Sequence, residues 1–246
     1  MNISPGVYTK IIDLSEYVQA VPGTIGFIPF ISEQGPDNQL IFTNSSDFYV
    51  DFGLPNINYV GKAYGQGPYM ASSFLRESES LYVVRCLPDD AAWSNLKLSS
   101  SAVDSTAYIT SSSVSGLNTD AEMAANLADE GDLVIFYGQG RGEFYNNYQI
   151  KISENANPES VGMYVLDIYK RQAENDPVTG NPQYEILSTF NISFDYRQLD
   201  PSGESMFIED VLNKYSRFVK CSANSDQCLI ANDLAANFST PLMLVL

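Results

Sequence analysis

Histidine is absent from the 246 residues, and cysteine and tryptophan are scarce, with three copies and one copy. Because histidine is the commonest general base and metal ligand, its absence excludes the ordinary serine and cysteine triads. The cysteine spacing fits no zinc template. We expect Cys86 to be a small buried hydrophobe inside an apolar strand. Cys221 and Cys228 could pair, but free thiols in a reducing cytoplasm are the favoured interpretation.

Positive charge is also scarce: 13 Lys and Arg face 30 Asp and Glu, which gives a formal net charge of −17. Nucleic acids and anionic membrane surfaces are bound mainly through Lys and Arg, so neither is an expected partner. A basic protein partner would suit this charge. The N-terminus shows no signal-peptide pattern, and no run approaches the roughly 18 apolar residues of a membrane span.

Catalytic patterns are missing as well. Gly138–Gly142 resembles a phosphate loop superficially but lacks the Lys-Ser/Thr pair of such a loop, so a tight connection between strands is expected. The neighbouring carboxylates Asp89-Asp90, Glu77/Glu79 and Glu209-Asp210 do not have the spacing of a calcium loop. We therefore expect no enzyme activity, no metal and no cofactor.

The chain does contain the apolar content of a folded core, 44% hydrophobic residues with 12% aromatics. Even spacing predicts a strand over Tyr184–Tyr196, and a stripe with a period near 3.6 predicts an amphipathic helix over Phe207–Val219. Thr24–Ile31 is a nearly continuous apolar run, typical of a strand covered on both faces. Strands alternating with helices near the N-terminus, followed by several short strands, predict a mixed α+β fold.

Local signals mark individual helices and the N-terminal segment. A short helix should begin at Ser45, Ser46 or Asp47 and end before Gly53, and Thr119–Glu122 has the spacing of a capping box. Residues 2–22 begin and end in Pro and Gly signals and alternate in polarity. They form either an edge strand of their own domain or an extended arm that adds a strand to another subunit.

Several stretches resemble, in a consistent order, the contractile tail sheath proteins of phages and related injection machines. Ser4–Tyr8 (SPGVY) with Ile11-Ile12-Asp13 resembles the opening of these proteins, and Thr24–Phe27 (TIGF) resembles the segment after their arm.

Five later stretches continue the resemblance. Ser46–Phe52 followed by glycine is similar to the family's "F-x-x-x-F-G" helix, and Leu81–Arg85 is similar to its "lyVvRV" core strand. Gly140–Ile152 resembles a Gly-turn-aromatic-Asn run that leads into a strand. Phe190–Phe194 and Ile208–Asn213 match a "tF-x-v-SF" strand and a "yIEDVLN" helix.

The resemblance implies a division of the chain and a set of functional residues. Residues 1–22 would be a linking arm, 23–98 with 206–246 part of an α/β core layer, and 99–205 a β-rich, barrel-like inserted domain on the outer surface. Since sheath subunits are longer, this chain would be the N-terminal portion of one. The marked residues are Pro5, Gly6, Val7, Tyr8, Thr9, Lys10 and Ile11 in the arm, and Gly26, Phe52, Gly53, Val84, Arg85, Ile208, Glu209, Asp210 and Val211 in the core motifs.

The resemblance also implies a structural function without bond chemistry. Subunits would polymerise as stacked rings around an inner tail tube and contract by rigid-body rearrangement, driving the tube through a target cell envelope. Other sheath subunits, the tube protein, and baseplate and tail-terminator proteins would be the partners. The protein would act in the virion tail after assembly in the host bacterial cytoplasm. The alternative is a β-rich baseplate- or fibre-associated module that binds a receptor or glycan through exposed tyrosines such as Tyr145 or Tyr148.

Overall fold

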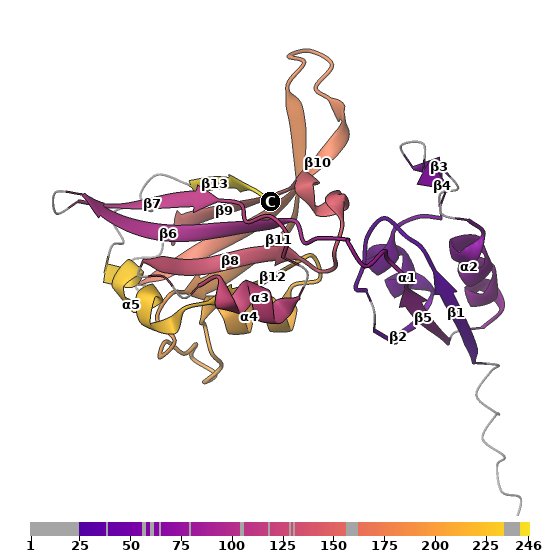
Figure 1. Cartoon of the computed structure of the whole chain (residues 1–246), viewed down its shortest axis with the longest axis horizontal. Coiled ribbons are helices and arrows are strands. Elements are labelled where there is room, and N and C mark those ends of the chain that lie inside the picture. Colours follow the sequence, from indigo (N-terminus) through magenta and orange to yellow (C-terminus); the bar gives the residue numbers. More distant parts are fainter. Residues whose placement is uncertain are drawn as a thin grey trace, which may run out of the picture.

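The structure is a computed structural model that describes residues 25–233 and 242–246, except residues 38, 56, 57, 60, 61, 64, 79, 104, 105, 118, 128, 130 and 156–161. The arm expected over residues 1–22, including Pro5 to Ile11, lies outside the described residues. Within the described part, the chain forms two units joined by residues 86–94 (Figure 1). We call residues 25–85 the small unit and residues 95–246 the large unit.

The mixed α+β fold expected from the sequence is confirmed. The small unit contains β1 (Gly26–Phe30), β2 (Ile41–Thr43), α1 (Ser45–Phe52), β3 (Asn58–Tyr59), β4 (Lys62–Ala63), α2 (Gly67–Glu77) and β5 (Leu81–Arg85). The large unit contains β6 (Asn95–Val103), β7 (Thr106–Ser112), α3 (Asp120–Ala125), β8 (Asp132–Gly138), η1 (Glu143–Asn147), β9 (Tyr148–Glu154), β10 (Met163–Asn175), β11 (Pro182–Ser193), α4 (Ile208–Tyr215), β12 (Val219–Ala223), α5 (Ser225–Asp233) and β13 (Leu242–Val245).

The small unit is a three-stranded sheet of order β1-β5-β2, with β1 parallel and β2 antiparallel to β5. Helices α1 and α2 cover one face of this sheet and bury a core of their own, formed by Phe30, Phe48, Phe52, Ala71, Leu75, Leu81 and Val83. Among the residues that the structure describes, no helix covers the opposite face. The strand expected to be covered on both faces is therefore covered on one within this described part, where Phe27 and Pro29 point away from the helices and are exposed.

Helix α1 shows how local sequence sets a boundary. Its N-cap is Asn44, not Ser45, Ser46 or Asp47 as expected, because Asn44 has an extended backbone. From there its side-chain oxygen accepts hydrogen bonds from the backbone N–H groups of Ser46 and Asp47. Gly53 ends the helix as expected, with φ 80°, a value that favours glycine.

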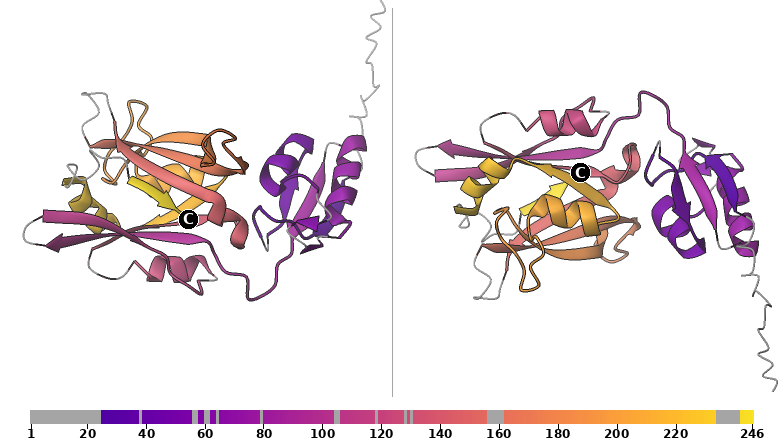
Figure 2. Two further views of the ribbon diagram at one scale, coloured as in Figure 1. Left: turned by 90° about the horizontal axis from the view of Figure 1, so that it is seen from above. Right: turned by 90° about the horizontal axis from the view of Figure 1, so that it is seen from below.

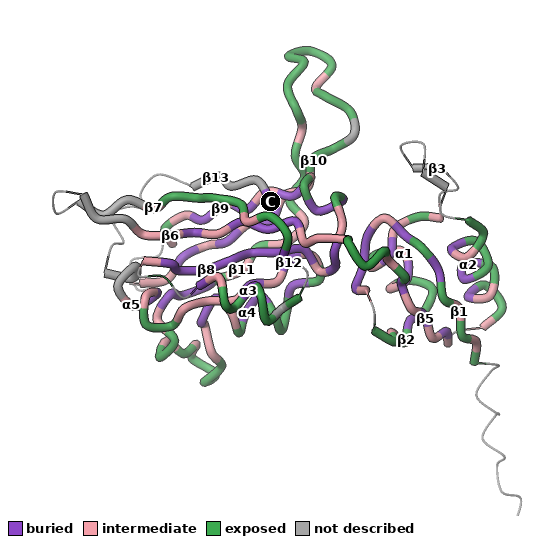
Figure 3. Tube along the Cα trace, in the orientation of Figure 1, coloured by how far each residue is buried: buried purple, intermediate pink, exposed green. Residues whose placement is uncertain are grey.

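The large unit packs two four-stranded sheets, β12-β8-β6-β7 and β11-β10-β9-β13, around a shared core (Figure 2). Side chains of β8, β9, β10 and β12 meet there; β8 is buried along its whole length, whereas buried residues alternate with partly exposed ones along β9 and β12 (Figure 3). Helix α3 covers the other face of β8, held by the capping box of Thr119 and Glu122 that the sequence predicted. The β10–β11 ribbon projects beyond the sheets (Figure 1).

The described part of residues 206–246 packs differently from the grouping that the resemblance implied. Ile208, Val211 and Leu212 of α4 and Val219 of β12 belong to the core of the large unit, whereas the small unit has a separate core. The reason is that β12 pairs with β8 of the large unit, and the apolar face of α4 packs in the same core as Phe194. None of the helices in the described ranges is long and apolar enough to span a membrane.

Candidate functional site at the junction of the two units

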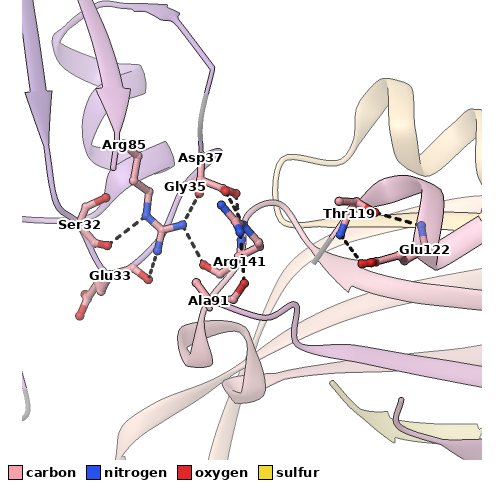
Figure 4. Close-up of polar contacts among 9 residues, drawn as sticks. All are labelled: Ser32, Glu33, Gly35, Asp37, Arg85, Ala91, Thr119, Glu122 and Arg141. Carbon is pink, nitrogen blue, oxygen red and sulfur yellow. Dashed lines mark hydrogen bonds and ion pairs between the residues drawn. The ribbon is translucent and has the colours of Figure 1, made fainter. Parts of the chain in front are cut away.

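Arg85, at the end of β5, joins the loop after β1 to the large unit. Its side chain is 1% exposed, and its guanidinium donates to four backbone carbonyls (Figure 4). The acceptors are Ser32 O at 3.1 Å from Nε, Glu33 O at 3.1 Å from Nη2, and Gly35 O at 2.8 Å and Arg141 O at 3.0 Å from Nη1. The planar, always charged guanidinium suits such multiple donation, which a lysine could not reproduce.

Gly138–Gly142, the turn after β8, forms the facing side of this junction. Arg141 pairs through Nε with Asp37 of the small unit at 2.7 Å, and its backbone N–H donates to the same carboxylate at 3.1 Å. Both side chains are less than one-tenth exposed. A Cβ at Gly140 would collide with the carbonyl oxygen of Gly35, so only glycine lets the two backbones approach this closely.

The turn also holds the linker between the units. The backbone N–H of Gly142 donates to Ala92 O at 2.9 Å, and Ser94 Oγ donates to Gly142 O at 2.9 Å. Arg141 Nη1 donates to Ala91 O at 3.3 Å. The connection expected at Gly138–Gly142 therefore contacts both the small unit and the linker, which the sequence pattern did not indicate.

Two buried tyrosines complete the junction. Tyr145 is 2% exposed and accepts a hydrogen bond from Gly35 N–H at 2.9 Å, and Tyr148 is 1% exposed. Burial raises the pKa of Tyr145 to about 12 and raises that of Tyr148 well above its ordinary value. The expectation that these tyrosines are exposed for ligand binding is wrong, because Tyr145 of η1 and Tyr148 of β9 both point into the core, where their ring centroids lie 5.5 Å apart.

Charged groups also line the rim of the junction. Arg217 donates to Asp47 of α1 at 2.9 Å, and this hydrogen bond lowers the pKa of the Asp47 carboxyl. Burial raises the pKa of Glu33, and this rise is opposed by the positive charges of Lys170 and Arg85. In the described part of the chain, no three His, Cys, Asp or Glu side chains gather as a metal site would require. The polar contacts of the junction hold the backbones of the two units together.

A second feature is the open face of the small-unit sheet. Phe27, Tyr82 and Phe42 lie opposite one another on β1, β5 and β2, and the rings of Phe42 and Tyr82 are 5.1 Å apart. Phe27 is 61% and Phe42 is 56% exposed. Val84 lies on the next row, opposite Pro29. We call Phe27, Pro29, Phe42, Tyr82 and Val84 the open apolar face; none of its side chains is charged.

Cys86 follows β5 and is exposed, so the expectation that it is buried is wrong. The apolar strand that was expected to include it ends at Arg85, whose side chain takes the inward position. Cys221 and Cys228 are buried free thiols, as the favoured interpretation predicted. Burial raises the pKa of Cys228 to about 12 and that of Cys221 well above its ordinary value, which leaves Cys86 as the accessible thiol among the three.

The other marked core residues have structural roles in different places. Gly26 begins β1 where a Cβ would lie 2.7 Å from the Phe74 ring. Phe52 is buried in the small-unit core, and Ile208 and Val211 are buried in the large-unit core. Asp210 is exposed and accepts a hydrogen bond from Ser205 Oγ at 2.6 Å. Glu209 accepts one from the backbone N–H of Ala223 at 3.3 Å.

The sequence pattern missed four residues of the junction, namely Gly35, Asp37, Arg141 and Tyr145. Two signals pointed to the region: an arginine at the end of a buried strand and a glycine-rich turn with a single arginine. Neither signal says that the two regions meet, because the partners are about 50 to 110 residues apart and most of the acceptors are backbone carbonyls.

The chain is thus an α+β protein of two units, and the buried polar groups of the junction hold these two units together. No protein-family model and no curated protein matches the chain. Among solved structures, it is similar to a sheath tail protein from Desulfitobacterium hafniense, at 14% identity and a TM-score of 0.38, over 89% of this chain and 35% of that chain. It is also similar to a sheath tail protein from Listeria innocua, at 12% identity and a TM-score of 0.36, over 81% of this chain and 30% of that chain. This chain thus spans about a third of the length of these proteins, and at such identities the likeness assigns no residue a role.

Proposed function

We propose that the chain is part of a structural subunit of a contractile tail sheath. The subunit polymerises as stacked rings around an inner tail tube and contracts by rigid-body rearrangement. Its partners are further copies, the tube protein, and baseplate and terminator proteins at the two ends. It acts in the virion tail after assembly in the host cytoplasm and performs no catalysis.

The observation that carries the proposal is the ordered set of sheath-like motifs along residues 4–219. Two of these motifs, which are far apart in sequence, meet in the junction: Arg85 ends the core strand, and Arg141 lies in the run that begins at Gly140. Two others share one core, since Phe194 and α4 both contribute to the large-unit core. The motif residues thus contact one another within the folded chain, as expected if they maintain the shape of a structural subunit.

The open apolar face supports assembly with other protein surfaces. Phe27 and Phe42 are exposed on either side of the partly buried Tyr82 on one sheet face, and such clusters of exposed apolar side chains usually mark contacts with other proteins. A face without charge also lets copies that each carry −17 approach without direct repulsion between charges at the contact. Binding through the tyrosines Tyr145 and Tyr148 has no such support because both are buried.

Electron microscopy of the complete gene product, concentrated at physiological salt, tests the proposal. Helical tubes or stacked rings are expected, and persistent monomers would contradict it. The role of the open apolar face is tested with Phe42→Glu, which should prevent assembly. Met70→Glu is the matched control, because Met70 is 58% exposed on α2, on the helical side of the small unit.

Cys86 provides a second readout on the unmodified protein. A maleimide probe should label Cys86 in the dispersed protein, since the other thiols are buried. In the assembled protein, labelling should fall if a neighbouring surface covers the end of β5. Equal labelling before and after assembly would place the contacts elsewhere on the molecule.

A further inference from the structure

Helix α4 presents three polar side chains to the outer edge of β12. Glu209, Asn213 and Ser216 lie at positions i, i+4 and i+7, which fall on one side of a helix and its C-cap. Strand β12 pairs with β8 along one edge and is the last strand of its sheet. Its other edge therefore faces α4 instead of another strand.

The three side chains form hydrogen bonds with backbone groups of that edge. The later a side chain comes in α4, the earlier its partner comes in β12. Ser216 Oγ accepts from Val219 N–H at 3.2 Å, and Asn213 Oδ1 accepts from Cys221 N–H at 3.1 Å. The Asn213 amide also donates to Cys221 O at 2.8 Å. Glu209 accepts from Ala223 N–H at 3.3 Å.

The spacing explains why a helix can serve a strand in this way. Four residues of helix rise about 6 Å, and two residues of strand rise about 6.6 Å, so successive helix turns stay level with alternate strand residues. At Cys221, the Asn213 side chain donates and accepts as the peptide of a neighbouring strand would. The α4 side chains thus replace the hydrogen bonds of a missing fifth strand.

An unprotected sheet edge is a template for pairing with another chain, and proteins commonly cover or block such edges. Asn213 is itself exposed, whereas Cys221, whose backbone groups it bonds, is buried. We infer that α4 closes the β12 edge against strand addition, with Asn213 and Glu209 as the residues that block it. A second copy of this chain, pairing β12 against β12, is the partner that this device excludes. The inference concerns one sheet edge and holds whether or not the proposed function is correct.

The test is the double variant Glu209→Ala and Asn213→Ala in the full chain. Alanine favours helix and Asn213 is exposed, so α4 should remain folded, which the melting temperature checks. Hydrogen exchange should become about tenfold faster or more at the Cys221 and Ala223 amides, because both lose their acceptors. Lys214→Ala, on the solvent side of the same helix, is the control and should leave both amides unchanged.

The consequence for association is measured by cross-linking. Lys220 lies within β12, so antiparallel pairing of two β12 strands brings two Lys220 amines near each other. An amine-to-amine reagent applied to a mixture of ¹⁴N and ¹⁵N protein should give a mixed-isotope Lys220–Lys220 product in the double variant and not in the unmodified protein. Unchanged amide exchange, or a folded variant without this product, would overturn the inference. Neither readout depends on whether rings or tubes form.

Discussion

Arg85 combines a charge with nearly complete burial, and its donation to backbone carbonyls explains how the protein tolerates this. Arg85→Met keeps the length of the apolar stem but leaves the carbonyls of Ser32, Glu33, Gly35 and Arg141 without this donor. Because buried acceptors left unpaired are costly, we expect a loss of about 3–5 kcal/mol in the free energy of unfolding. Denaturant unfolding measures it.

Arg76→Met is the matched control, since Arg76 is exposed in the last turn of α2. It should change the free energy of unfolding by no more than about 0.5 kcal/mol. Arg85→Lys should restore only part of the loss, because an ammonium group cannot reach carbonyls arranged around a planar fork. Equal effects of the Arg85 and Arg76 substitutions would mean that the junction contributes little to stability.

Glu209 makes stability depend on pH in a direction opposite to that of a salt-bridged carboxylate. Burial raises the pKa of Glu209 in the folded protein, so the folded state binds the proton more tightly than the unfolded chain. The charged carboxylate therefore lowers stability above the folded pKa, and this cost disappears as the pH falls below the ordinary pKa of 4.5.

Glu209→Gln removes the charge and keeps an acceptor oxygen for Ala223 N–H. The variant should melt at a higher temperature than the unmodified protein near pH 7, and the difference should shrink towards about pH 4. Thermal unfolding followed by circular dichroism at several pH values measures this difference. A gap that widens on acidification would show that the charged form of Glu209 is stabilising.

At the scale of elements, the turn at Gly138–Gly142 determines whether the two units stay together. Gly140→Ala places a Cβ against the carbonyl oxygen of Gly35, which must move away from Arg85 and Tyr145. We expect the junction to open while each unit keeps its own core. Small-angle scattering should show a larger radius of gyration, and limited proteolysis should cut faster within residues 86–94.

Gly116→Ala is the control for Gly140→Ala. Its Cβ would meet no atom within 4 Å, and its φ of 79° gives it only the usual cost of a left-handed residue, about 1 kcal/mol. The control should leave the radius of gyration and the cleavage rate unchanged. If Gly140→Ala behaves in the same way, the units are joined by contacts other than this turn.

Elements whose signals are local could be predicted from the sequence, and contacts between elements could not. The capping box at Thr119 and the end of the helix at Gly53 each depend on a few adjacent residues. The cap at Asn44 was missed because four consecutive residues can all cap a helix, and backbone conformation selects among them. The junction was missed because charge and burial say that Arg85 needs acceptors without saying which carbonyls provide them.

Whether a strand is covered on one face or on both depends on how all the elements pack, so the sequence of that strand alone cannot predict it. The apolar run of β1 predicts cover on both faces, yet in the described part of the chain helices pack on one face only. The periodicity over Phe207–Val219 correctly predicted that the α4 face with Val211 is apolar, but the helix ends at Tyr215, which is exposed, and Val219 lies in β12. Glu209 and Asn213 do not simply face solvent, since they bond the edge of β12. Only the position of β12 turns these polar residues into edge contacts.

At the scale of the whole molecule, the net charge of −17 opposes association between copies, whereas the open apolar face favours it. Salt screens the first effect strongly, since the Debye length falls from about 30 Å at about 0.01 M to about 10 Å at about 0.1 M. Salt weakens the attraction between apolar faces little. Association of the complete gene product should therefore increase as sodium chloride rises through this range, measured by sedimentation velocity at constant protein concentration.

The variants of the open apolar face separate the two contributions. Phe42→Glu adds a charge within the contact and should keep the protein dispersed at every salt concentration, whereas Met70→Glu adds the same charge outside it and should only shift the onset to higher salt. If association instead weakened with added salt, pairing of opposite charges would drive it. The contacts between copies would then lie on surfaces such as the one around Arg217 and Asp47, and the open apolar face would serve another purpose.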